Sequence, residues 1–196
     1  MNPTISAAPV PAGWVERMNL RSNDLVDYEN GGPALGVVPS DAENNAYEWT
    51  CECVGNDVRV YRDGVAPVVV LSEPGITLVS FAFDQAMNVH VVYVASGVVK
   101  FRYWDTLSTA YATMTIPGAR TPRCCSDEKT PYLSADRDVV VAYLVGTELK
   151  LRLQQDRYLV EYTKAPPIPP HQPITTETKL VSVGMNTGRR LQWRFT

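Results

Sequence analysis

A hairpin pattern that recurs along the chain limits the possible folds more than any other feature. Residues 91–102 and residues 141–152 align at an offset of 50 residues. The alignment pairs Tyr93 with Tyr143, Lys100 with Lys150, and Arg102 with Arg152. In each copy a glycine lies in the turn, and the basic residues alternate with apolar ones, as the two faces of a β-strand require. The pattern therefore predicts repeated antiparallel hairpins.

A fainter copy of the hairpin precedes these two, over residues 53–61. Its residues 58–60 (Val, Arg, Val) correspond to residues 99–101 (Val, Lys, Phe). Successive β units of about 40 to 50 residues are typical of propeller blades. Because a propeller has about four to eight blades, three units do not close one. The sequence leaves three packings open: an open fragment, a compact sandwich, or blades completed by neighbouring subunits.

Composition supports a mainly β fold. The 196 residues include 15 prolines, which recur through much of the chain and interrupt helices. With 45% hydrophobic and 20% charged residues, the chain has the composition of a folded soluble protein, large enough for one domain or two small ones. A net charge of −3 gives no general attraction to nucleic acid, so we expect no specific nucleic-acid binding.

The chain divides into four predicted parts. Residues 1–46 form an extended N-terminal arm, or alternatively a polar linker; residues 47–164 form the core of repeated hairpins. Residues 165–178 form a proline-rich connector close to polyproline II, and residues 179–196 form a C-terminal hairpin or edge strand. The strongly apolar stretch at residues 89–95 is too short to cross a membrane, and the N-terminus lacks a secretory signal. We therefore expect synthesis in a cytoplasm and no membrane partner.

Within the core, turn residues separate short runs of strand-forming residues. The predicted strands of the two main repeats cover Ile76 to Phe83, Val89 to Ala95, Val98 to Trp104, Tyr111 to Ile116, Asp138 to Val145, Glu148 to Leu153 and Tyr158 to Tyr162. The segment from Arg120 to Thr130 is predicted to be a loop.

The four cysteines fall into two pairs. Cys51 and Cys53 are two apart on a predicted strand and so face the same side, whereas Cys124 and Cys125 are adjacent in the predicted loop. Neither pair has the Cys-x-x-Cys spacing of zinc knuckles or thioredoxin-like sites. Buried thiols are the preferred interpretation. A composite four-cysteine zinc site and a disulfide formed outside the cell are the alternatives.

The sequence contains no recognisable catalytic motif. Phosphate loops, nucleophile elbows and zinc-binding His-Glu-x-x-His helices are absent from it. His90 lies in an apolar strand and His171 in the proline-rich segment, where we expect packing or solvent roles. The acidic pairs Asp136 with Asp138 and Asp127 with Glu128 lie in turn-like segments, where aspartate commonly binds backbone groups. We predict no catalytic residue, cofactor or resident metal.

Basic residues gather on one face of the repeated hairpins and at the C-terminus. Lys100, Arg102, Lys150 and Arg152 are predicted to form a solvated face that protects a strand edge; binding of an acidic partner is the alternative. Residues 189–195 mix basic and aromatic side chains in the manner of a nucleic-acid surface. In an acidic protein, however, a single such strand favours an interface or an edge strand.

Several stretches resemble a protein family encoded among the structural genes of tailed bacteriophages. They are residues 76–94, Gly97, residues 100–105, 138–144, 149–152, 155–158, 160–162, 183–186 and 190–192, with a weaker match at residues 30–35. The resemblance covers residues 45 to 195, and its motifs are β-structural ones. It implies a virion structural protein of the tail or the head-to-tail region, and it carries over no catalytic residue.

We therefore predict a virion component that acts through protein–protein contacts in a symmetric oligomer, with other tail or connector proteins as partners. Arm exchange and burial of apolar strand faces would hold such an assembly. Because aromatic residues and arginine anchor interfaces, the candidate interface residues are Trp14, Trp193, Arg194 and Phe195, with a core role for either tryptophan equally open.

Three alternatives remain. The first is a receptor- or glycan-binding module of a tail fibre, which requires aromatic residues such as Trp104 or Tyr111 exposed in a groove. The second is a decoration protein on the capsid surface. A glycan or peptidoglycan hydrolase comes last, because it needs two carboxylates that converge in a cleft.

Overall fold

The computed structural model describes residues 34–39, 46–62, 64–84, 88–126, 139–164, 173–185 and 191–195. These residues form three four-stranded antiparallel sheets and one two-stranded sheet, with a short 3₁₀ helix at Gln154–Asp156. The prediction of a mainly β protein built from antiparallel hairpins is confirmed.

Every strand in each sheet pairs with its neighbour in the sequence. Sheet 1 contains β1 (Ala34–Pro39), β2 (Ala46–Val54), β3 (Asp57–Arg62) and β4 (Val68–Ser72). Sheet 2 contains β5 (Ile76–Phe83), β6 (Val89–Ala95), β7 (Val98–Asp105) and β8 (Ala110–Ile116). Sheet 3 contains β9 (Ala119–Ser126), β10 (Val139–Val145), β11 (Glu148–Leu153) and β12 (Tyr162–Lys164). Sheet 4 contains β13 (Leu180–Met185) and β14 (Leu191–Phe195).

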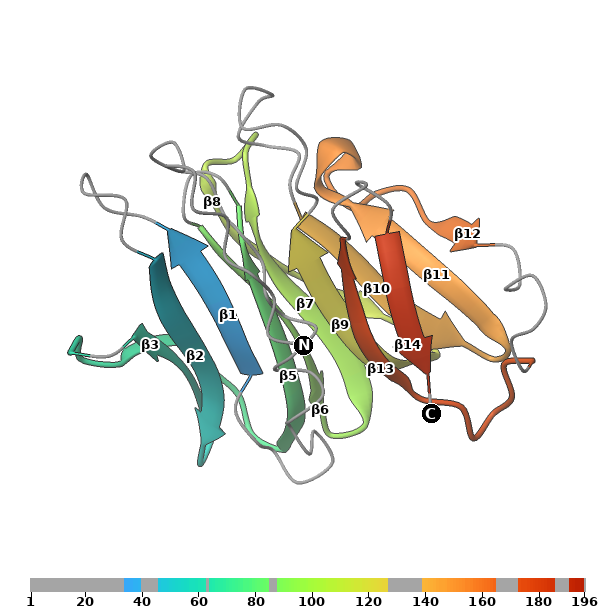
Figure 1. The fold of residues 1–196 in the computed structure, drawn as a ribbon, viewed down its shortest axis with the longest axis horizontal. Helices are drawn as coiled ribbons and strands as arrows, with labels where there is room; N and C mark the ends of the chain where they lie inside the picture. Colours follow the sequence, from blue (N-terminus) through green and yellow to red (C-terminus); the bar gives the residue numbers. More distant parts are fainter. Residues whose placement is uncertain are drawn as a thin grey trace.

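The sheets pack in series along the chain (Figure 1). One apolar cluster lies between sheets 1 and 2, a second between sheets 2 and 3, and a third between sheets 3 and 4. The first strands of successive sheets contact one another, β1 with β5, β5 with β9, and β9 with β13. Each interface is therefore formed by consecutive units of the chain.

This serial packing explains why the central strands are apolar at nearly every position. In β10, Val141 and Tyr143 face sheet 2, whereas Ala142 and Leu144 face sheet 4. A strand covered on both faces has no solvent side and loses the alternation of a half-buried strand. In sheet 1, by contrast, Val58 and Val60 of β3 pack toward sheet 2 while Arg59 between them points the other way.

The repeat predicted from sequence occupies equivalent places in sheets 2 and 3. Tyr93 of β6 is opposite Lys100 of β7, and Tyr143 of β10 is opposite Lys150 of β11. The fainter copy also fits, because it forms the β2–β3 hairpin of sheet 1, in which Glu52 is opposite Arg59. The second and third strands of each four-stranded sheet are thus the same structural unit.

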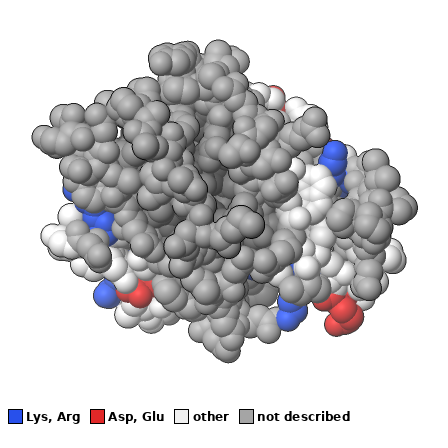
Figure 2. Space-filling view, viewed as in Figure 1, with Lys and Arg blue, Asp and Glu red and all other residues white. Residues whose placement is uncertain are grey.

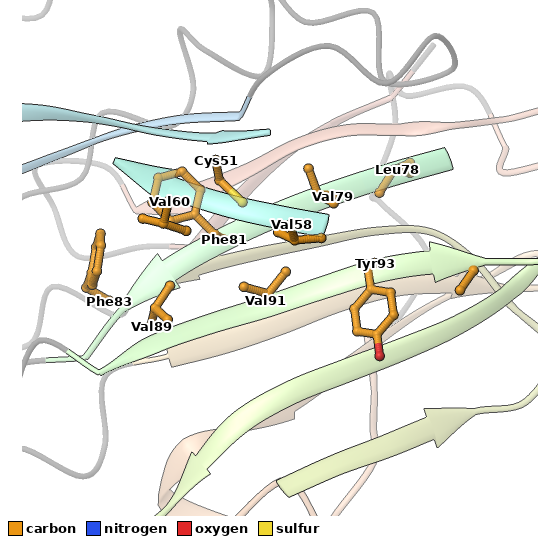
Figure 3. Close-up of a cluster of buried hydrophobic side chains, with 11 residues drawn as sticks. Cys51, Val58, Val60, Leu78, Val79, Phe81, Phe83, Val89, Val91 and Tyr93 are labelled. Carbon is orange, nitrogen blue, oxygen red and sulfur yellow. The ribbon is translucent and has the colours of Figure 1, made fainter. Parts of the chain in front are cut away.

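Figure 3 shows the apolar cluster between sheets 1 and 2. Cys51, Val58 and Val60 of sheet 1 meet side chains of β5 and β6, among which Phe81 and Phe83 contact each other edge to face with ring centroids 5.6 Å apart. The hydroxyl of Tyr93 points away from this cluster. Burial of apolar side chains in this cluster stabilises the fold by about 25 cal/mol for each Å² of apolar surface removed from water.

Three predicted segments differ from the structure. Cys124 and Cys125 lie in β9 and not in a loop, because that strand pairs along its length with β10. Residues 158–161, predicted as part of a strand, follow the 3₁₀ helix as a turn and irregular segment, and the strand begins only at Tyr162, as β12. Residues 34–39, assigned to the extended arm, form β1 and pair with β2.

The other arm residues and residues 165–172 of the predicted connector lie outside the described residues. The last part of the connector packs on the core, since Ile174 is buried in the third cluster. The C-terminal hairpin predicted over residues 179–196 is present as β13 and β14.

Candidate interaction surface

A buried polar network joins sheets 2 and 3. The Nε2 atom of His90 lies 3.3 Å from Oδ2 of Asp84, and the hydroxyl of Tyr158 lies 3.0 Å from Nδ1 of the same histidine. Gln154 donates from Nε2 to Oδ2 of Asp84 at 3.2 Å. None of these four residues is more than 4% exposed. The network has no access for a substrate, and it acts as a tie between sheets.

The Asp84 carboxylate stays ionised within this network. Burial alone would raise its pKa, but hydrogen bonds from His90 and Asn88 outweigh that effect and hold the pKa below its usual value. The sequence interpretation of His90 as a packing residue does not include these polar partners: Asp84 lies six residues earlier in the connection to β6, and Tyr158 lies 68 residues later in the chain.

The four cysteines are present as thiols, and three of them are buried. Cys51, Cys124 and Cys125 belong to the first, second and third apolar clusters respectively. Burial, followed by the nearby Cys124 and Cys53 thiols, raises the pKa of Cys51 well above its ordinary value. Among the described residues, no group of three or more metal-ligating side chains comes together.

Each of the two repeated tyrosines donates a hydrogen bond to a glutamate and lies on the face of its sheet that packs toward the preceding sheet. Tyr93 donates to Oε2 of Glu73 at 2.9 Å, and Lys100 donates to the same carboxylate. The Lys100 hydrogen bond is the main cause that keeps the pKa of Glu73 below its ordinary value. Glu73 comes from the connection between sheets 1 and 2, so this group ties the two sheets.

In sheet 3 the equivalent group is built by a different glutamate. Tyr143 donates to Oε2 of Glu161 at 2.5 Å, and Arg152 donates to that atom from Nη2 at 3.2 Å and to the Tyr143 hydroxyl from Nε at 2.8 Å. Lys150 lies 2.7 Å from Glu148. The predicted solvated face is therefore wrong for Lys150 and Arg152, whose side chains are 13% and 18% exposed and paired with acids of the same chain.

Arg102 is the exception among the four basic residues. Its guanidinium lies over the ring of Tyr111, 3.7 Å from the centroid, and within the described part of the chain it forms no ion pair. Its Nη1 atom is buried and has no hydrogen-bond partner. Trp104 contacts Tyr111 edge to face at 5.1 Å, so these three side chains form one aromatic–basic group on sheet 2.

The outer strands of sheets 1 and 2 form uncharged sheet edges. β4 and β8 contain no charged residue, and in the described ranges each pairs with one neighbour only. Val68 and Val69 of β4 are 59% and 49% exposed, and Tyr111 of β8 is 38% exposed. Soluble proteins usually protect such edges with lysine, proline or a covering segment, because open edges pair with other strands.

An open hollow of about 330 Å³ lies between β5–β7 and the start of β9. Its lining is mainly apolar, and its one charged residue is Arg120. The Arg120 guanidinium already donates to the backbone carbonyls of Thr175, Thr178 and Gly146, which fastens the segment before β13 to sheet 3. The hollow therefore offers no group arranged for chemistry.

Two of the four residues predicted as interface anchors have described side chains. Trp193 and Phe195 are half-buried and pack against the third apolar cluster, and the Lys164 ammonium lies 5.6 Å from the Trp193 ring centroid. Trp14 and the side chain of Arg194 lie outside the described residues. So do His171, Asp127, Glu128, Asp136 and Asp138.

Charged side chains are scattered over the described part of the face in Figure 2, with both signs near its rim. The described residues also include no helix with the length and apolar character needed to span a bilayer. Comparisons with protein-family models, with curated proteins and with solved structures found no match.

Proposed function

We propose that this protein is a structural component of a bacteriophage virion, of the tail or the head-to-tail region, and that it works by adding partner strands to its sheet edges. The observation that carries the proposal is the pair of uncharged, exposed edge strands β4 and β8. Strand addition satisfies the open backbone groups of such an edge and covers its apolar side chains. The sequence resemblance to tailed-phage structural proteins supplies the setting.

The proposed architecture is an array of propeller-type blades. Each four-stranded meander is one blade, with the first strands β1, β5 and β9 innermost and the fourth strands β4, β8 and β12 outermost. Three apolar interfaces in series support blades over a two-layer sandwich, which has one interface. In this arrangement β13 and β14 are the inner half of a fourth blade.

The polar residues of this fold favour a function through protein–protein contacts. The buried histidine, the paired glutamates and Arg120 all bind other parts of the same chain. His90, Glu73 and Arg120 connect successive parts of the fold, whereas Glu161 joins strands within sheet 3; together these contacts favour a rigid scaffold with exposed edges. We propose that the partners are further copies of the chain and other virion proteins, in a symmetric oligomer located in the virion, with no catalytic step.

The test is to place a charge on the β4 edge. Val68→Lys and Val69→Lys should leave folding unchanged, because both side chains are exposed, and should abolish assembly measured by native mass spectrometry, alone and with the neighbouring tail, connector and capsid proteins. Val98→Lys is the matched control, since Val98 is 41% exposed but lies at a hairpin turn of β7, away from the edge. A wild-type protein that stays monomeric and binds none of these proteins would refute the proposal.

A glycan-binding module of a tail fibre is the second candidate, and the exposed Tyr111 beside Trp104 favours it. The Tyr111 hydroxyl accepts a hydrogen bond from the Val89 amide at 3.2 Å, and Arg102 covers one face of the ring. These contacts leave less ring surface for a sugar. Binding to a glycan array that Tyr111→Ala removes would support this second candidate.

A further inference from the structure

The repeat provides an internal comparison of two arginines. Arg102 is opposite Val91 on the neighbouring strand, and Arg152 is opposite Val141, so the two occupy the same place in sheets 2 and 3. Their carboxylate partners differ. Arg152 donates to Glu161, the residue directly before β12, at 3.2 Å. In sheet 3, the acid that pairs with this arginine is thus supplied by the outer edge of the sheet.

In sheet 2 the outer strand supplies no acid at the corresponding place. The residue of β8 opposite Arg102 is Thr113. Glu73 already accepts hydrogen bonds from Tyr93 and Lys100. Arg102 is left with the Tyr111 ring and a buried Nη1 without an acceptor. Such an unsatisfied donor is unfavourable until an acceptor arrives, and a carboxylate is the strongest one available.

The face around Arg102 is open to an added strand. Tyr111, Thr113 and Thr115 alternate along β8 on the same side as Arg102, and all three are exposed. A strand that pairs with β8 would lie two strand spacings, about 10 Å, from β7. The extended side chains of an arginine and a glutamate together span that distance across the short Thr113 side chain.

We propose that β8 receives an extended acidic segment of a protein partner, one of whose Asp or Glu carboxylates pairs with Arg102. This inference rests on the proposed function, because it names the chemistry of a partner strand. The Arg102 guanidinium lies over the Tyr111 ring, and a guanidinium with an unsatisfied N–H group favours a charge-assisted hydrogen bond to a carboxylate. The incoming acid takes the place that Glu161 fills beside Arg152.

The experiment uses the full chain and two synthetic octapeptides with blocked ends, one alternating Thr and Glu, the other alternating Thr and Gln. In an extended strand the alternation places all acids on one face. We expect the acidic peptide to bind the wild-type protein by titration calorimetry and the neutral peptide to bind at least tenfold more weakly. Arg102→Gln should weaken binding of the acidic peptide at least tenfold.

Two further variants define the site. Thr113→Glu places a carboxylate opposite Arg102. It should also weaken binding of the acidic peptide at least tenfold, because Arg102 is then paired within the chain. Arg59→Gln is the matched control: Arg59 occupies the equivalent of Lys100 in sheet 1, far from β8, and should change the affinity less than twofold.

Three results would overturn the inference: no binding of the acidic peptide to the wild-type protein, equal binding by Arg102→Gln, or a preference for a polyglucuronate oligosaccharide over the peptide. Virion assembly distinguishes this failure from that of the proposed function. If the wild-type and Arg102→Gln proteins associate with virion proteins equally well, the structural role stands and the acidic-segment inference is wrong.

Discussion

Asp84 is the acceptor at the centre of the polar network between sheets 2 and 3. It is 1% exposed, and it accepts hydrogen bonds from the Asn88 amide, the Asn88 side chain and Gln154 beside the His90 ring. Asp84→Ala leaves these donors buried without their acceptor, so we expect the free energy of unfolding to fall by about 3 kcal/mol. Urea denaturation followed by circular dichroism measures it.

The control for this change is Asp57→Ala. Asp57 also accepts a hydrogen bond, from Ser72 at 2.6 Å, and lies near Arg59, but its side chain is 35% exposed. We expect a loss below about 1 kcal/mol, because water replaces the lost partners. Equal losses for the two variants would contradict a special role for the buried network.

The same carboxylate predicts a dependence of stability on pH. Because its folded pKa lies below the unfolded value of about 3.9, the unfolded chain binds the proton more readily. The stability that Asp84 contributes is therefore complete above about pH 5 and is lost as the pH falls through the folded pKa. Asp84→Asn should reduce the slope of unfolding free energy against pH between about pH 5 and pH 3, measured by urea titration. An unchanged slope would refute the assignment.

At the scale of elements, the connection between β4 and β5 requires a glycine. Gly75 has φ of +74°, and its carbonyl accepts a hydrogen bond from the Ser96 amide at 2.9 Å. A Cβ there would lie 2.7 Å from Ser96 Oγ and 3.3 Å from Ser96 N. Gly75→Ala should therefore lower stability by about 2–3 kcal/mol, from both the backbone conformation and the collision.

Gly64→Ala separates these two causes. Gly64 has a similar φ of +76°, but a Cβ added to it meets nothing within 4 Å. Its substitution should cost about 1 kcal/mol, the conformational part alone, by the same denaturation assay. A cost for Gly75→Ala no larger than this would show that the contact with Ser96 is relaxed easily.

The sequence predicts some elements well because their signal is local. β6 and β10 each form a hairpin with the next strand, and the apolar run and glycine turn of each lie within that hairpin. The repeat is therefore visible in the sequence. β9 has no such signal, because its residues mix arginine, proline and cysteine. Arg123 in that strand is 4% exposed and donates from Nε to the carbonyl of Val181 in β13 at 2.8 Å. A contact over 58 residues has no local pattern.

The sequence predicts only some of the hydrogen-bonded groups on the candidate surface. Alignment of Tyr93 with Tyr143 singled out the two tyrosines, but not Glu73 and Glu161, which reach them from unrelated places in the two sheets. Arg102 and Arg152 are likewise equivalent in sequence and different in surroundings. The repeat specifies the position of each side chain, whereas the segments outside the repeat decide its partner.

For the whole molecule, serial packing couples each sheet to the next. Sheet 2 contributes to the first two apolar clusters and sheet 3 to the last two, so neither can unfold without exposing two interfaces. Phe101 and Tyr158 illustrate the coupling: their rings contact edge to face across the second cluster with centroids 4.6 Å apart, and Tyr158 also binds His90. The described sheets are therefore expected to unfold together.

Leu144→Ala tests this cooperativity at a distance. Leu144 is fully buried in the third cluster, so the cavity should cost about 2–5 kcal/mol. If the sheets unfold as one unit, amide hydrogen exchange in β6, which faces the first two clusters, should accelerate by the same free energy as exchange in β13. Val98→Ala, at a 41% exposed position, should change neither rate by more than about 0.5 kcal/mol. Faster exchange in β13 with β6 unchanged would mean that the last sheet opens independently, as the weakly coupled units of a repeat array do.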